Sequence, residues 1–108
     1  MSLFENMLPE GLWKYFEEIL HIPRPSDQEE QIQAYLMSFA NSHALDYQID
    51  KTGNIVIRKS ASSGMEHVPV IVLQSHMDMV CEKNTDVELD FLKDPIPAYI
   101  DGDWVKSK

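Results

Sequence analysis

A histidine and an aspartate stand two residues apart at the end of an apolar run, and this spacing can build a metal ligand. His76 and Asp78 follow the apolar stretch Val68–Leu73. Side chains at i and i+2 of an extended segment point to the same side, with a rise of ~3.3 Å per residue. Asp78 can therefore accept a hydrogen bond from one ring nitrogen of His76 while the other nitrogen binds a metal, and such a carboxylate fixes the tautomer and orientation of the ligand. His76 is then one ligand among several, because a catalytic zinc takes about three protein ligands.

The apolar run before His76 predicts a buried strand. Val70 to Leu73 is apolar at every position, which is typical of a strand covered on both faces. Functional groups of α/β sheets gather beyond the carboxyl ends of such strands. The alternative, a loop histidine hydrogen-bonded to a nearby carboxylate, stays open, and the strand before the motif adds weight to the metal site.

Two amphipathic helices are expected before this strand. The first opens at Leu8-Pro9-Glu10-Gly11 and ends near His21, because the prolines that follow disfavour the helical conformation at the residues before them. His21 then lies where a histidine interacts favourably with the helix dipole. The second helix follows Ser26-Asp27-Gln28-Glu29, a pattern that predicts a capping box, and it ends near Asn41-Ser42.

Two hairpins complete the predicted elements. Leu45 to Asp50 and Asn54 to Lys59 read as paired strands joined by a short turn. Pro97 to Val105 reads as a second hairpin, with Asp101-Gly102 at its turn. Together these elements predict an α/β fold with two helices, a hairpin and a buried central strand. The last strand has only just begun where the sequence stops, so residues 1–108 are expected to be the incomplete first part of a larger domain.

The composition excludes several classes of protein. The net charge of −9 argues against nucleic acid and against anionic membranes as partners. No apolar run approaches the ~20 residues that cross a bilayer, and no secretory signal is recognisable. Cys81 is the only cysteine, so no internal disulfide can form and a reducing cytoplasm is the expected location. As a site residue Cys81 is a weak candidate, and a small packing side chain is the preferred interpretation.

The residues around His76 resemble a known family. The stretch Leu73-Gln74-Ser75-His76-Met77-Asp78-Met79-Val80 is similar to the first metal motif of the aminoacyl-histidine dipeptidases, which belong to a clan of di-metal exopeptidases with aminoacylase and carboxypeptidase relatives. Further segments fit the same family in the same order: Leu12-Trp13, Ile22-Pro23-Arg24-Pro25-Ser26, Gly53-Asn54-Ile55, Asp94-Pro95-Ile96 and Tyr99–Lys106. The resemblance therefore covers nearly the whole chain.

The resemblance implies a function and assigns roles. It makes His76 a zinc ligand and Asp78 the active-site residue that orients it. For the complete enzyme it implies a homodimer that binds two zinc ions and hydrolyses dipeptides, typically those with histidine as the second residue. This chain is then the start of a catalytic domain of the zinc-exopeptidase type. In the family, the bridging aspartate, the general-base glutamate and the remaining ligands come later than the position of Lys108. The 108-residue chain alone is therefore expected to be inactive.

A hypothesis of a different class is a non-catalytic acidic α/β module. An open strand edge can accept a strand from another protein, which gives such a module a way to bind its partner. Metal binding that needs a longer chain favours the peptidase. Binding of a protein partner, with no zinc uptake by either form, favours the module.

Overall fold

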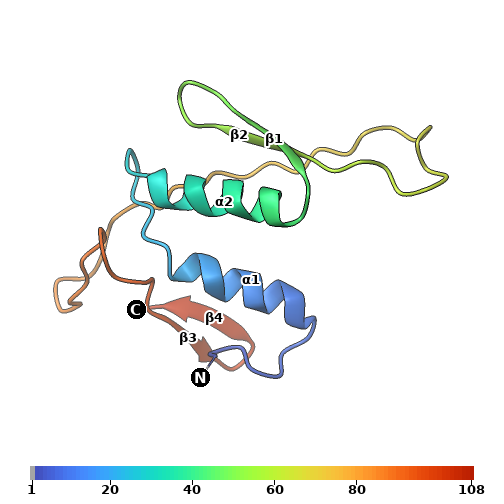
Figure 1. The fold of residues 1–108 in the computed structure, drawn as a ribbon. Helices are drawn as coiled ribbons and strands as arrows, with labels where there is room; N and C mark the ends of the chain where they lie inside the picture. The colour runs from blue at the N-terminus through green and yellow to red at the C-terminus, as the bar shows by residue number, and fades with distance from the viewer. Residues whose placement is uncertain (1) are drawn as a thin grey trace. The chain divides into compact units, whose positions relative to one another are not determined.

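The computed structural model describes residues 2–108 and has a mixed α/β fold, as predicted. Along the chain the elements are α1 (Glu10–Leu20), α2 (Glu30–Ser42), β1 (Asp46–Ile49), β2 (Ile55–Arg58), β3 (Ala98–Asp101) and β4 (Trp104–Ser107) (Figure 1). The strands form two separate antiparallel hairpins, β1–β2 and β3–β4. The chain divides into two compact units, one made of the residues up to Ile32 together with Asp78–Lys108, the other made of Gln33–Met77.

In the first unit, α1 begins and ends where the sequence predicts. Pro9 precedes it with an extended backbone (φ −74°, ψ 133°), a conformation that suits the residue before a helix. At the other end the backbone N–H of His21 donates to the carbonyl of Glu18 at 3.2 Å. The ring Nδ1 of His21 also lies 2.8 Å from the carbonyl oxygen of Glu17, so this histidine closes the last turn of the helix.

Three aromatic rings pack together in this unit. Phe4 is only 3% exposed, and its ring centroid lies 5.0 Å from that of Trp13 and 5.6 Å from that of Phe16. Trp13 donates its Nε1–H to the carbonyl of Leu8 at 3.2 Å, which satisfies the polar atom of a large apolar side chain. The backbone N–H of Leu3 also donates to the Glu17 carboxylate at 2.7 Å, so the segment before α1 is fixed to the helix by stacking and by hydrogen bonds.

The β3–β4 hairpin turns one residue later than predicted. Asp101 is paired with Trp104, so the two loop residues are Gly102 and Asp103. Gly102 has φ 59°, and a two-residue hairpin loop favours a glycine at a position of positive φ. The predicted glycine does lie in the loop, but it is the first loop residue and not the second.

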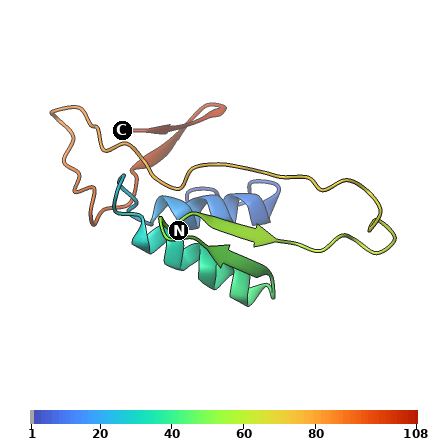
Figure 2. The same cartoon turned by 90° about the horizontal axis from the view of Figure 1, so that it is seen from above.

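In the second unit, the hairpin between β1 and β2 confirms the sequence prediction. Its register runs from Asp46 opposite Arg58 to Ile49 opposite Ile55, and Figure 2 shows the two strands side by side. The carboxylate of Asp50 organises the turn. It accepts hydrogen bonds from the backbone N–H groups of residues 52 and 54, both at 2.9 Å, and from the Nδ2 of Asn54 at 2.8 Å.

The predicted buried strand before His76 is wrong for this structure. Val70 to Leu73 forms no strand, and its four side chains are 80–93% exposed. In Figure 2 the chain after β2, drawn in yellow, runs outward and returns without a strand arrow. The physical reason is a lack of partners. A buried strand needs neighbours for its backbone N–H and C=O groups, and within residues 2–108 each hairpin strand pairs only with its own partner.

Candidate functional site

The candidate site lies where the segment after α1 meets the segment that contains Asp78. The backbone N–H of Met79 donates to the carbonyl of Arg24 at 2.9 Å, and Pro25 forms a parallel bridge with Met79. Next to this bridge, the hydroxyl of Ser26 donates to Oδ2 of Asp78 at 2.6 Å. Two stretches of chain that are far apart in sequence are thus joined by backbone and side-chain contacts at one of the two predicted site residues.

Arg24 anchors the first of these stretches. Its Nη1 donates to the carbonyl of Ile19, in the last turn of α1, and to that of Ile22 at 3.4 Å. Burial lowers the pKa of the Arg24 guanidinium, because the charged form loses part of its hydration. The guanidinium therefore ties the end of α1 to the segment that carries Ser26.

The predicted capping box at Ser26 is wrong. Residues 25–28 form a turn closed by the N–H of Gln28 and the carbonyl of Pro25 at 2.9 Å, with Asp27 at φ 68°. α2 begins only at Glu30, and the Glu29 carboxylate accepts from the N–H of Asp27 at 2.9 Å instead of from that of Ser26. Local spacing predicted a cap, but the turn directs the Ser26 hydroxyl to an acceptor 52 positions along the chain.

His76 and Asp78 differ in their exposure. The His76 side chain is exposed, and the Asp78 side chain is partly buried. Within residues 2–108, no group of three or more histidine, cysteine, aspartate or glutamate side chains is arranged to hold a metal ion. The donor types fit zinc as a first ligand and its orienting partner, because imidazole binds zinc directly and a hydrogen-bonded carboxylate is its usual support. A working site needs further ligands.

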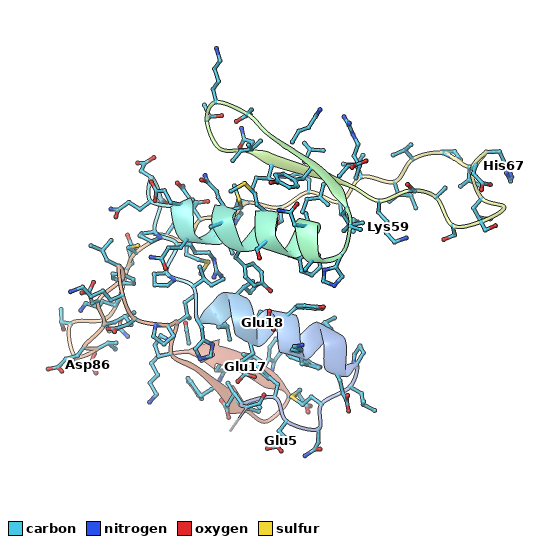
Figure 3. All side chains as sticks on the ribbon, viewed as in Figure 1. Glu5, Glu17, Glu18, Lys59, His67 and Asp86 are labelled. Carbon is cyan, nitrogen blue, oxygen red and sulfur yellow. The ribbon has the colours of Figure 1, made fainter. Side chains whose placement is uncertain are left out.

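The other residues with chemical potential have structural surroundings. Cys81 is exposed, and its Sγ lies 3.7 Å from the carbonyl oxygen of Met79. The ring of His43 stacks on Phe39 with centroids 4.1 Å apart at the end of α2. His67 lies at the tip of the loop after β2, as Figure 3 shows. None of these contacts points to a reaction.

The acidic segment after the site is held together locally. The backbone N–H of Asp90 donates to the carboxylate of Asp94 at 2.7 Å, and Lys93 forms an exposed ion pair with Asp90 at 3.8 Å. These bonds make a small turn within a polar surface segment.

The known proteins that this chain resembles are dipeptidases. No protein-family model matches the chain. The chain is 46% identical over 108 residues to the cytosol non-specific dipeptidase of Escherichia coli (strain K12), covering 100% of this chain and 22% of that protein. It also matches a crystal structure of the aminoacylhistidine dipeptidase from Vibrio alginolyticus with a TM-score of 0.90 and 44% identity, covering 100% of this chain and 23% of that one.

These findings confirm the resemblance predicted from the sequence. The similarity extends over the entire chain, and its fold follows that of the matching part of the solved dipeptidase. The chain spans less than a quarter of the length of the relatives it matches. Within residues 2–108, no helix is long and apolar enough to cross a membrane.

Proposed function

We propose that this chain is part of a longer zinc-dependent dipeptidase, in which it supplies the first metal motif. The similarity to two dipeptidases along the whole 108 residues is the observation that carries the proposal. The His76-x-Asp78 spacing supports it independently, because it suits a ligand and its orienting carboxylate. Residues 1–108 are then the first part of the catalytic domain.

His76 and Asp78 have separate tasks in this proposal. His76 holds zinc through one ring nitrogen of its neutral imidazole. Asp78 accepts a hydrogen bond from the N–H at the other ring nitrogen, so that the ring presents a lone pair to the metal. Zinc, once bound, supplies Lewis acidity toward the peptide carbonyl and lowers the pKa of bound water. The other ligands and the general base are contributed by residues outside this chain, which alone is inactive.

The substrates we propose are dipeptides, typically with histidine as the second residue. The relatives are named as a non-specific dipeptidase and an aminoacylhistidine dipeptidase, and both names concern dipeptides. A cytoplasmic location is supported by the name of the first of these relatives and by the lone cysteine. We also propose that the complete enzyme is a homodimer without nucleic acid or membrane partners.

The test is a pair of histidine substitutions in the complete protein. His76→Ala removes the proposed ligand, whereas His67→Ala makes the same chemical change at the tip of the loop after β2, at a residue with no role in the proposed site. We expect His76→Ala to lose bound zinc, measured by elemental analysis, and to lose dipeptide hydrolysis by at least about 100-fold, since removal of a mere supporting residue already costs about 10–100-fold. His67→Ala should retain both. Unchanged zinc content and hydrolysis in His76→Ala would eliminate the proposal.

A further inference from the structure

We propose that Ser26 is a positioning residue of the metal site, because its hydroxyl holds the carboxylate that orients the zinc ligand. This inference rests on the proposed function of His76 and Asp78. The contact itself is short: Ser26 Oγ lies 2.6 Å from Oδ2 of Asp78. This distance is typical of a hydroxyl bound to a charged carboxylate, roughly 2.5–2.7 Å, and such a bond is about twice as strong as one between neutral groups.

The backbone on both sides fixes the position of the Ser26 hydroxyl. The turn over residues 25–28 aims Ser26, and it contains Asp27 at φ 68°, a left-handed conformation that aspartate tolerates. The bridge between Pro25 and Met79 sets the separation of the two stretches, and Pro25 itself is buried. The hydroxyl and the carboxylate are therefore adjacent because the two backbones are paired, and the bond requires little extra ordering of either side chain.

The destination of the hydrogen bond distinguishes positioning from capping. A capping serine bonds to the first turn of its own helix, but this hydroxyl donates to a residue 52 positions away, beside the proposed ligand. A carboxylate has about four lone-pair sites, so the bond to Ser26 is compatible with further acceptance from an imidazole. With Oδ2 held, rotation of the Asp78 carboxylate is restricted, and so is the direction from which it can accept a hydrogen bond from the His76 ring.

Substitutions of Ser26 in the complete protein test this role. Ser26→Ala removes the donor, and Ser26→Thr keeps the hydroxyl at an exposed position where an added methyl group has room. Ser42→Ala is the matched control, because the Ser42 hydroxyl contacts near neighbours in the chain: it donates to the carbonyl of Phe39 at 3.0 Å and lies 3.1 Å from Nδ1 of His43. We measure the zinc dissociation constant by competition with a chelator, together with the unfolding midpoint of the metal-free protein.

We expect Ser26→Ala to weaken zinc binding about tenfold, at the lower end of the effect of outer-sphere partners. Ser26→Thr should stay within about twofold of the original protein, and so should Ser42→Ala. A fall in metal-free stability with unchanged zinc affinity in Ser26→Ala would assign Ser26 a structural role and overturn the proposal. If Ser26→Ala does not fold, Ser26→Cys replaces it as a weak donor of similar size, and equal zinc affinity of the Cys and Thr variants overturns the proposal as well.

The two proposals fail in different ways. If His76→Ala keeps its zinc, the proposed function is wrong whatever Ser26 does. If His76→Ala loses zinc and Ser26→Ala binds it as tightly as the original protein, only the role of Ser26 is wrong.

Discussion

The exposed apolar segment Val70–Leu73 yields a quantitative prediction about the longer protein. Its four side chains are 80–93% exposed in this structure. Full burial of a valine, leucine or isoleucine side chain contributes about 1.5–3 kcal/mol, so four of them represent roughly 6–12 kcal/mol of hydrophobic free energy. A typical domain has a total stability of about 5–15 kcal/mol. Under the proposed function the remainder of the dipeptidase covers this segment, and the stability of the complete protein then depends on it.

The perturbation is Ile71→Asp in the complete protein, with Met65→Asp as the control. Ile71 is 85% exposed here and Met65 is 48% exposed in the loop after β2, so neither side chain is buried within this chain. We expect Ile71→Asp to lower the free energy of unfolding by at least about 3 kcal/mol, because it removes about 1.5–3 kcal/mol of burial and places a charge in an apolar layer. Met65→Asp, at a surface loop, should change it by less than about 0.5 kcal/mol.

The assay is urea unfolding of the two variants, followed by circular dichroism. A loss of less than about 0.5 kcal/mol for Ile71→Asp, equal to the control, would refute the reasoning. The segment would then be a solvated loop, and the idea of a strand completed by a longer chain would have to be abandoned.

Three further predictions concern the two units separately. Phe4→Ala should destabilise the first unit by about 3–5 kcal/mol, because Phe4 is 3% exposed and packs on two aromatic rings; denaturant unfolding measures the loss, and a change below about 1 kcal/mol contradicts the packing. Gly53→Ala should be more damaging than Gly64→Ala. Both glycines have positive φ (95° and 83°). A Cβ at Gly53 would lie 2.2 Å from Nε2 at the end of the flexible Gln33 side chain, which must move aside, whereas one at Gly64 meets nothing within 4 Å, so the additional loss is small. Equal losses in melting temperature would exclude the steric contribution. Hydrogen bonds from Asn54 and Thr52 lower the pKa of Asp50 from 3.8 to about 2, so the turn is stabilised above pH 3.8 and this contribution is lost as the pH falls through about 2. NMR titration of the Asn54 amide measures the midpoint, and a midpoint near 3.8 would disprove it.

The elements that could be predicted from the sequence are those whose causes are local. α1 is delimited by Pro9 at its start and by His21 at its end, both within a turn of the helix. The β1–β2 hairpin follows from two apolar stretches and a turn that contains Gly53 at φ 95°. Such signals act over a few residues, so a sequence pattern captures them.

Two of the predictions that failed depended on partners far along the chain. Val70–Leu73 has the composition of a covered strand, but composition does not supply neighbours, and within residues 2–108 none pairs with it. Ser26 has the spacing of a helix cap, but Asp78 provides a charged acceptor that competes with the helix. One local signal could have indicated the turn: Asp27 follows Pro25-Ser26, and aspartate is a residue that adopts positive φ in turns.

Only part of the candidate site could be predicted from the sequence. The roles of His76 and Asp78 come from spacing and family resemblance, and both stay predictions until a metal is measured. The contribution of Ser26 was missed, because no pattern within a single segment connects residues 52 positions apart. The structure adds the contact that sequence spacing could not provide.

The most direct measurement is a crystal structure of the complete protein with zinc, with the metal located by anomalous scattering. The account predicts zinc at about 2.0–2.1 Å from a ring nitrogen of His76, with the other ring nitrogen donating to Asp78. Zinc held entirely by other residues, with the His76 ring turned toward solvent, would contradict it.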